Sequence, residues 1–262
     1  MKKTTFVVVS TKGGTGKTIV SSMVLPVLFA GTDKEITVYS IDDNNTIRIK
    51  SRYITFKDLS TKDSESVVDE AELKRITNNN DISIIDVGGG ADTHIFLKTI
   101  KNSVVEGLIY IIPIGDDIEQ IDNLIETISE IKNASNDAKI YLILNQVNNL
   151  DEDSIKSQFL GIYGSVKYGV DAINEDILDD IEEVYFLEAS PIFSILKNIY
   201  QHGLLDAFIG AEELLENLYS KKNEWALKGE EYFKKQNSSV RLAQDVIKLT
   251  KRIYSMKNIV EE

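Results

Sequence analysis

The clearest chemistry in the sequence lies in one glycine-rich segment, residues 12–18, with the sequence KGGTGKT. Glycines at such positions let consecutive backbone N–H groups turn inward around a phosphate, and the N-terminus of a following helix adds its dipole. We expect Lys17 to reach the terminal phosphates of a nucleotide and the Thr18 hydroxyl to hold Mg²⁺. The G-x-x-x-x-G-K-[ST] pattern is broken once, because Thr11 stands where the first glycine belongs.

A second candidate for phosphate chemistry follows the apolar run Ile82–Ile85. Asp86 ends this run, where a carboxylate is expected to bind Mg²⁺ or one of its waters. Gly89, three residues later, allows a backbone N–H to approach the γ-phosphate, because glycine has no side chain in the way. The two segments together predict binding of a nucleoside triphosphate with Mg²⁺.

The glycine-rich segment resembles the deviant Walker A motif of the ParA/MinD ATPases, dimeric switches that segregate DNA or position the division machinery. The deviant motif tolerates the absence of the first glycine. The resemblance implies that Lys12 crosses a dimer interface to the phosphates of the partner. It extends more loosely, as strand order and residues at strand ends, to about residue 205.

The family also carries an Asp-x-Asp-Pro-Gln loop that contacts Mg²⁺ and the attacking water. The corresponding strand here, Ile36–Ile41, is followed by Asp42-Asp43-Asn44-Asn45. Aligned by strand phase, Asp42 is the first aspartate and Asn44 takes the second position. Shifted by two residues, Asp42 is the second aspartate and Ser40 takes the first position. Asp42 is the predicted participant in both alignments, and the roles of Asp43 and Asn44 stay open.

The predicted base-binding loop is Asn145-Gln146-Val147-Asn148, after the apolar run Ile140–Leu144. In the family an asparagine at the position of Asn145 hydrogen-bonds the adenine. GTPases place Asn-Lys-x-Asp here, and that aspartate pairs with two guanine donors. Asn148 cannot accept two hydrogen bonds as a carboxylate does, so the loop favours ATP over GTP. Pro191 is matched to the second base-contacting loop of the family.

The predicted site therefore has three overlapping sets of residues. The nucleotide-binding residues are Lys12, Gly13, Gly14, Thr15, Gly16, Lys17, Thr18, Ile19, Gly89, Asn145 and Pro191. The metal ligands are Thr18, Asp42 and Asp86, and the catalytic residues are Lys12, Lys17 and Asp42. His94 and His202 are isolated in the sequence and are predicted to be surface or helix residues, and the acidic stretch Asp171–Glu183 a solvated face.

Apolar runs rich in β-branched residues predict the strands that position these groups. They are Phe6–Val9, Ile36–Ile41, Ile82–Ile85, Leu108–Ile112, Ile140–Leu144 and, more weakly, Val184–Leu187. Helical patterns lie between them, over Thr18–Phe29 with Pro26 ending or kinking the helix, over Asp69–Ile76, and at Ile118, Ile121, Ile125, Ile128 and Ile131. This alternation predicts an α/β fold with a doubly wound, mostly parallel sheet, in which ligands lie at the carboxyl ends of the strands.

After about residue 189 only helical patterns follow, over Pro191–Gln201, Ala211–Ser220, Glu224–Lys235 and Ser238–Met256. We expect one domain over residues 1–262, with a nucleotide-binding core (1–205) and a helical extension (206–262). The net charge is −13, but Lys221–Lys257 contains ten Lys or Arg and four Asp or Glu, a charge of +6, so the remaining residues carry −19. A basic, helical C-terminal region predicts non-specific DNA binding in the ATP-bound dimer.

Composition narrows the class of protein. No cysteine is present, which excludes a disulfide framework and a zinc–thiolate site, and no apolar run is long enough for a membrane span. We expect a cytoplasmic, weak, partner-stimulated ATPase that acts in plasmid partition with a centromere-binding adaptor protein. The alternatives are a MinD-like positioning switch, disfavoured by the terminal acids Glu261 and Glu262, a conjugative-transfer or cargo ATPase, and a metabolic P-loop enzyme, which would need a second substrate site.

Overall fold

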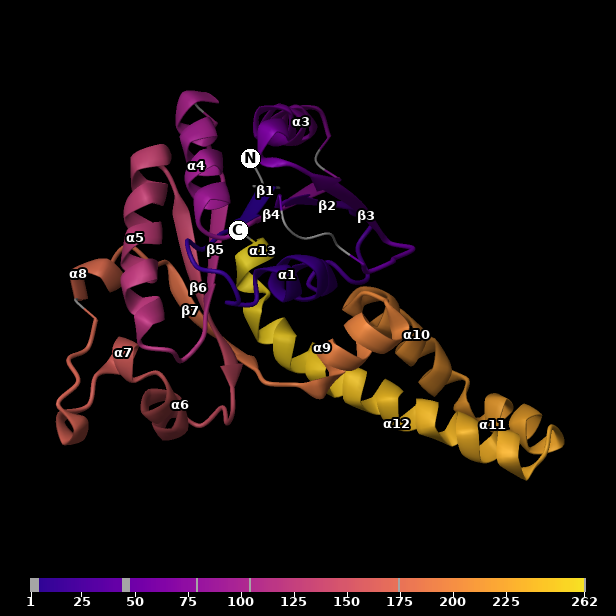
Figure 1. Ribbon diagram of the computed structural model, residues 1–262. Helices are drawn as coiled ribbons and strands as arrows, with labels where there is room; N and C mark the ends of the chain where they lie inside the picture. Colours follow the sequence, from indigo (N-terminus) through magenta and orange to yellow (C-terminus); the bar gives the residue numbers. More distant parts are fainter. Residues whose placement is uncertain (1–4, 44–47, 79, 104, 174, 262) are drawn as a thin grey trace.

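The computed structural model describes residues 5–43, 48–78, 80–103, 105–173 and 175–261, and its strands form a single sheet (Figure 1). Seven strands, all paired in parallel, follow the order β3-β2-β4-β1-β5-β6-β7. They are β1 (Thr5–Val8), β2 (Glu35–Ile41), β3 (Ile54–Leu59), β4 (Asp81–Val87), β5 (Ile109–Ile114), β6 (Lys139–Val147) and β7 (Glu183–Glu188). Helices cover both faces of this sheet, so the predicted doubly wound α/β fold is confirmed.

Each of the six predicted strand runs overlaps an observed strand, including the weaker run in β7. The seventh strand, β3, was not predicted. It lies at the edge of the sheet, where Thr55 and Asp58 are exposed and Ile54 is buried. An edge strand of this kind mixes polar and apolar residues, whereas the prediction relied on runs that are apolar on both faces.

Two hydrophobic clusters fill the two faces of the sheet. One face is covered by α3 (Ser64–Thr77), α4 (Ala91–Ser103) and α5 (Glu119–Ala134), which bury residues such as Phe96 and Ile128. The predicted helices at Asp69–Ile76 and around Ile118–Ile131 correspond to α3 and α5, whereas α4 was not predicted. Four short helical segments are described between β6 and β7: α6 (Glu152–Gln158), α7 (Leu160–Tyr163), the 3₁₀ helix η3 (Val166–Tyr168) and α8 (Glu175–Leu178).

The helix that follows the glycine-rich segment is continuous through a π-helical stretch. It consists of α1 (Lys17–Ile19), the π-helical η1 (Val20–Val24) and α2 (Leu25–Val27). The backbone N–H of Leu25 bonds to the carbonyl of Val20, five residues earlier, just before Pro26, which has no N–H to donate. The helix predicted over Thr18–Phe29, with Pro26 ending or kinking it, thus ends at Val27, one residue after Pro26.

The other face of the sheet is covered by α1–α2 and by the C-terminal helices. These are α9 (Pro191–Ile195), η4 (Leu196–Tyr200, π-helical), α10 (Leu204–Glu216), the second half of α12 (Glu230–Ile253), η5 (Tyr254–Met256) and α13 (Asn258–Glu261). The helix α11 (Leu218–Leu227) lies between α10 and α12 in the sequence and contributes no residue to this cluster. The predicted helix Glu224–Lys235 is wrong, because Gly229, with φ 101°, separates α11 from α12. This conformation is one that glycine adopts readily and other residues avoid.

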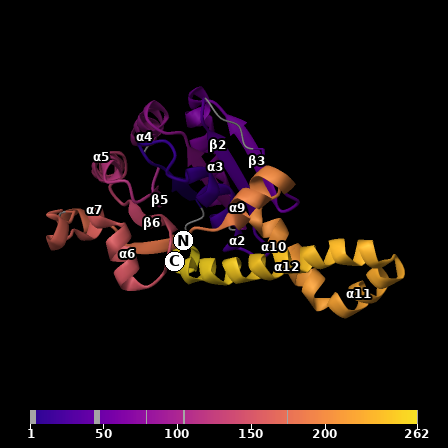
Figure 2. The ribbon, with the colours of Figure 1, turned by 60° about the horizontal axis from the view of Figure 1, so that its bottom comes forward.

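The helices α11 and the first half of α12 pack together and project from the body of the molecule as an arm (residues 218–241; Figures 1 and 2). The second half of α12 lies against the sheet, where Val246 joins the same hydrophobic cluster as Phe6 and Phe208. The division into one domain with a core and an extension stays a prediction. Among the described helices, none has the length and apolarity to cross a membrane.

Candidate phosphate-binding site

The glycine-rich loop joins β1 to α1 at the carboxyl edge of the sheet. Gly14 and Gly16 have φ values of 78° and 97°, which L-residues with side chains rarely adopt. A Cβ atom at Gly16 would also lie 2.1 Å from Nδ2 of Asn145. Glycine is therefore required at position 16 for two reasons, the backbone conformation and the close approach of Asn145 on β6.

Hydrogen bonds from α4 and α5 hold the entry to this loop. The backbone N–H of Thr11 donates to Oγ1 of Thr127 on α5 (3.1 Å), and Oγ1 of Thr11 donates to the carbonyl of Asn123 (3.1 Å). On α4, Oγ1 of Thr93 donates to the carbonyls of Ser10 (3.1 Å) and Gly88 (2.7 Å). The residue that replaces the expected first glycine thus anchors the loop through its side chain.

Lys17 is buried at the first position of α1 and points back into its own loop. Its Nζ donates to the carbonyls of Lys12 (2.9 Å) and Ser10 (3.4 Å). Burial lowers the pKa of Lys17, while the nearby carboxylates of Asp86 and Asp42 act in the opposite direction. The ammonium group is therefore held at the base of the loop by neutral partners.

Asp86, near the end of β4, lies beside the start of α1. Burial raises the pKa of Asp86 to about 6, although hydrogen bonds from the side chains of Thr18 and Ser21 and the charge of Lys17 favour its ionised form. Two hydroxyls and one carboxylate thus meet here, and a hard cation prefers such oxygen ligands. Ser21 was not predicted, because a serine within a helix carries no sequence signal for this contact.

The residues after β2 separate into different roles. Asp42 lines the same cavity as Thr18 and Asp86. The carboxylate of Asp43 instead accepts hydrogen bonds from the backbone N–H (2.9 Å) and the hydroxyl (2.8 Å) of Thr61. Asp43 is therefore engaged with the segment that leads to α3. Asn44 lies outside the described residues.

These groups surround a cavity of about 890 Å³. It is lined by Gly13, Gly14, Gly16, Lys17, Thr18, Ile19, Ser40, Asp42, Arg48, Ile49, Asp86, Val87, Gly88, Gly89, Asp92, Lys197, Asn198 and Gln201. Nine predicted site residues are in this set. Arg48, Asp92, Lys197, Asn198 and Gln201 were not predicted, because only the fold brings the segment before β3, the start of α4 and η4 to the phosphate loop.

Four predicted site residues do not line this cavity: Lys12, at the edge of the loop, and three others, Asn145, Thr15 and Pro191. Asn145 is buried beneath the loop, where its Nδ2 donates to the carbonyl of Thr15 (2.9 Å) and its Oδ1 accepts from the N–H of Gln146 (2.9 Å). Thr15 is buried, and Pro191 begins α9. None of the three is among the described residues that line the cavity, so base contacts by Asn145 and Pro191 stay predictions.

Lys12 lies at the rim of the loop and is partly exposed. Its Nζ is 3.2 Å from Oε2 of Glu119 and 3.5 Å from Oδ2 of Asp117, at the start of α5. The hydrogen bond with Glu119 is the main reason that the pKa of Lys12 is raised. The lysine side chain therefore points away from its own phosphate loop and pairs with acids of the same chain.

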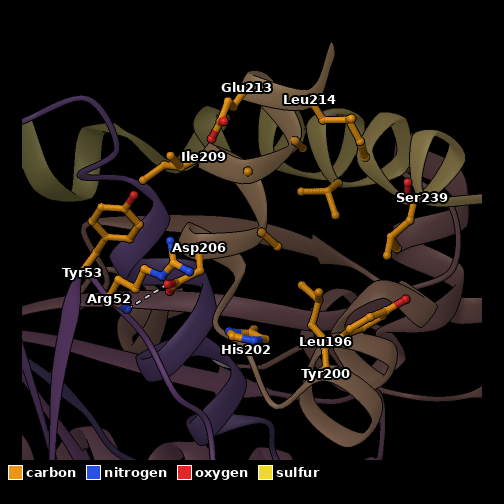
Figure 3. A pocket seen from close by; sticks show the side chains of 16 residues that line it. Arg52, Tyr53, Leu196, Tyr200, His202, Asp206, Ile209, Glu213, Leu214 and Ser239 are labelled. Atoms are coloured by element: carbon orange, nitrogen blue, oxygen red, sulfur yellow. Dashed lines mark hydrogen bonds between the residues drawn. The ribbon is translucent and has the colours of Figure 1, made fainter. Parts of the chain in front are cut away.

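A second, apolar cavity of about 360 Å³ lies between η4, α10 and α12 (Figure 3). Leu196 and Tyr200 of η4 line it on one side and Leu214 of α10 on another. Lys197 of η4 and Gln201, which directly follows η4, line the phosphate cavity. The short π-helical segment η4 is thus a wall common to both cavities.

A parallel sheet with a phosphate-binding loop after its first strand, and acids at the ends of the neighbouring strands, defines a P-loop nucleoside triphosphatase. Residues 12–218 match the family described as Gtr1/RagA G protein conserved region, and the chain belongs to this family. No curated protein matches the sequence.

Solved structures with a similar fold include the MinD cell division protein of Aquifex aeolicus. It has 16% sequence identity and a TM-score of 0.52, and the match covers 77% of this chain and 89% of that chain. An ATP complex of a single-residue variant of McdA from Cyanothece has 14% identity and a TM-score of 0.49, with 82% of this chain and 97% of that chain covered. At this level of identity the likeness to the A. aeolicus protein establishes the fold.

Proposed function

We propose that this protein is an ATP- and Mg²⁺-dependent dimeric switch of the ParA/MinD type. The observation that carries the proposal is the convergence of Lys17, Thr18, Asp42 and Asp86 on one cavity. The resemblance to this family rests on a phosphate loop in which Lys12 precedes Lys17 by five residues. The most direct test is nucleotide binding and hydrolysis by the purified chain.

Within the cavity, Lys17 is the residue that meets the terminal phosphates. A phosphate oxygen offers its ammonium group a charge-assisted hydrogen bond, which is stronger than those with the carbonyls of Ser10 and Lys12. The glycines supply backbone donors along the loop. Binding of a triphosphate is thus expected to draw Lys17 out of its contacts with the loop carbonyls.

The donor set of Thr18, Asp42 and Asp86 fits magnesium, because all three offer hard oxygen atoms from one wall of the cavity. Bound Mg²⁺ would neutralise charge that develops on the phosphate oxygens during hydrolysis. Asp42 is the candidate to orient the attacking water. The Asp42→Ala variant should therefore lose hydrolysis more than it loses ATP binding.

The base is proposed to be adenine, although the family description refers to G proteins. The supporting observation is the loop after β6, where Asn148 stands in place of the aspartate that pairs with guanine. Calorimetry with ATP and GTP in the presence of Mg²⁺ tests this point. Equal affinities, or tighter binding of GTP, would contradict it.

Dimerisation is proposed to bring Lys12 to the phosphates of a partner subunit. Its present ion pairs with Asp117 and Glu119 are partly exposed and therefore weak enough to exchange. The expected behaviour is a monomer that becomes a dimer with a non-hydrolysable ATP analogue, and a Lys12→Ala variant that binds ATP but does not hydrolyse it. An unchanged mass in light scattering would contradict this step.

The proposed output is plasmid partition, through a centromere-binding adaptor and non-specific DNA. Lys228, Lys234, Lys235 and Arg241 are exposed on the arm, and α12 continues this basic surface toward the body. Arg252 forms an ion pair with Glu188, so it is less available to a ligand. Two arms on one dimer would double the number of phosphate contacts, so DNA binding should need ATP and weaken steeply with salt.

A positioning switch of the MinD kind is the alternative, which the likeness to the A. aeolicus protein supports at the level of fold. The deciding experiment compares the ATPase rate of the dimer alone, with plasmid DNA, and with vesicles of anionic lipid. Stimulation and a mobility shift with DNA support partition. If vesicles stimulate the ATPase rate and DNA shows no mobility shift, the positioning switch at a membrane is the better reading.

A further inference from the structure

Three metal-ligating side chains meet on the outer side of α4 and α5, away from the phosphate cavity. His94 lies near the start of α4, and Glu126 and Glu130 lie one turn apart on α5. One ligand atom from each of the three residues lies within 4.8 Å of the other two. The Nδ1 atom of His94 is 2.6 Å from Oε1 of Glu130.

This arrangement brings two carboxylates together and leaves one buried carboxylate oxygen without a hydrogen-bond partner among the described residues. The Oε2 atom of Glu130 is buried and has no hydrogen-bond partner within the part of the chain that the structure describes. Glu126, one helical turn away, adds a second carboxylate of the same sign, which destabilises a helix. A buried carboxylate oxygen without a donor is costly, and a cation at this point would compensate it.

We propose that His94, Glu126 and Glu130 form a binding site for a divalent transition metal such as Zn²⁺. One imidazole nitrogen with carboxylate oxygens is a ligand set that suits zinc, cobalt or nickel, whereas magnesium prefers oxygen ligands alone. Three protein ligands leave a coordination position for water. Binding replaces the hydrogen bond between His94 and Glu130 by two metal–ligand bonds and displaces the proton that they share.

The metal would join the two helices that hold the phosphate loop. His94 follows Thr93, whose hydroxyl donates to the carbonyl of Ser10, and Glu126 precedes Thr127, whose hydroxyl accepts from the N–H of Thr11. A metal between α4 and α5 would fix the spacing of these two anchors. The site is therefore placed to couple metal binding to the geometry of the loop, without contact with the nucleotide.

The test uses the full chain, freed of metal and without nucleotide, so that its outcome does not depend on the proposed ATPase function. Calorimetric titration with ZnCl₂ and visible absorption with CoCl₂ should both give one site per chain. His94→Ala and Glu126→Gln should each weaken binding at least tenfold. Because Glu126 is exposed, its conversion to glutamine leaves the fold intact, and unchanged circular dichroism checks this for both variants.

His202 provides a matched control, since it is the other of the two histidines in the sequence and lines the apolar cavity. The His202→Ala variant should bind zinc and cobalt as the parent does. Absence of binding by the parent chain at 100-fold molar excess of metal would overturn the proposal. So would full binding by the His94→Ala variant, or loss of binding in the His202→Ala variant alone.

Discussion

The ammonium group of Lys12 lies 3.2 Å from the carboxylate of Glu119, so the lysine that we propose to act across a dimer interface is engaged within its own chain. A dimer must break this contact before Lys12 can reach the phosphates of the partner. In the proposed dimer, the acids at the start of α5 would therefore oppose association. They would make the switch more dependent on bound nucleotide.

The Glu119→Gln variant should release Lys12 and favour the ATP-dependent dimer. Because the contact is exposed to solvent, the expected gain in dimer affinity is small, about two- to fivefold. Light scattering over a concentration series with a non-hydrolysable ATP analogue measures it. Asp122→Asn, on the same helix, removes the same charge and should leave the dimer affinity unchanged. A weaker dimer in the Glu119 variant would show that this acid supports the interface.

The Lys17→Ala variant should lose nucleotide binding by at least about 100-fold, because the only buried ammonium group described in the cavity is removed. Calorimetry with ATP and Mg²⁺ measures the loss. Lys98 on α4 is exposed and does not line the cavity, so Lys98→Ala serves as the control. Retention of micromolar ATP binding by the Lys17 variant would place the phosphates elsewhere.

Asp86 makes the nucleotide-free protein less stable as the pH rises. Its pKa is raised to about 6, above that of an unfolded aspartate, so the folded state binds more protons between about pH 4 and pH 6 and its stability falls over this range. The Asp86→Asn variant should thus be more stable than the parent at pH 7.5, by about 1–3 kcal/mol, with a smaller gain at pH 4.5. Urea unfolding at both pH values measures this.

The same Asp86→Asn variant should lose Mg²⁺-dependent ATP binding, so stability and function change in opposite directions. Asp81→Asn, at the other end of β4, is the control and should leave Mg²⁺-dependent ATP binding unchanged. A destabilised Asp86→Asn variant at pH 7.5 would indicate that the ionised carboxylate is needed for folding.

Gly16→Ala should destabilise the chain by about 1–3 kcal/mol, because its φ of 97° strains any residue with a side chain and its Cβ would meet Asn145. Gly13→Ala is the matched control, since a Cβ there would have no atom within 4 Å. Adding Asn145→Ala should relieve the clash but not the backbone strain. Urea unfolding of the three variants separates the two causes, and equal stability of the Gly13 and Gly16 variants would refute both.

Charge reversal on the arm should weaken DNA binding by the ATP dimer at least tenfold, because phosphate contacts dominate non-specific affinity. The variant carries Lys228→Glu, Lys235→Glu and Arg241→Glu. The control reverses Lys98 and Lys101 on α4 and Lys62 in the short 3₁₀ helix η2 (Thr61–Asp63) before α3; all three are exposed, and the net charge changes equally. Mobility shifts at several salt concentrations compare them. Equal weakening by both variants would point to overall charge instead of the arm.

Local sequence signals were sufficient to predict the position of the glycine-rich loop and of the central strands. The loop needs glycines and lysines at fixed spacing, and strands buried on both faces, such as β4, are continuous apolar runs. Residues that enter the site from distant segments have no such signal. Arg48 and Lys197 reach the cavity only because the segment before β3 bonds to the end of η4, where the N–H of Lys50 donates to the carbonyl of Gln201 (2.8 Å).

The same limit applies to contacts between helices. His94 is isolated in the sequence, and its closeness to Glu130 arises from the packing of α4 on α5. The partners of Lys12 lie more than 100 residues away along the chain. The role proposed for Lys12 across an interface rests on family resemblance, whereas its ion pairs within the chain could be found only from the fold.

The arm is attached to the body at one end only, through α10 and the second half of α12. Val246 is buried against the body, whereas Glu230, at the other end of the arm, is sixteen residues away, about 24 Å along a helix with a rise of 1.5 Å per residue. A tilt of about 10° at the base would therefore move the tip by about 4 Å. Any tilt of α12 that accompanies nucleotide binding would displace the tip most, so labels at the tip would report such a tilt more sensitively than labels near the base.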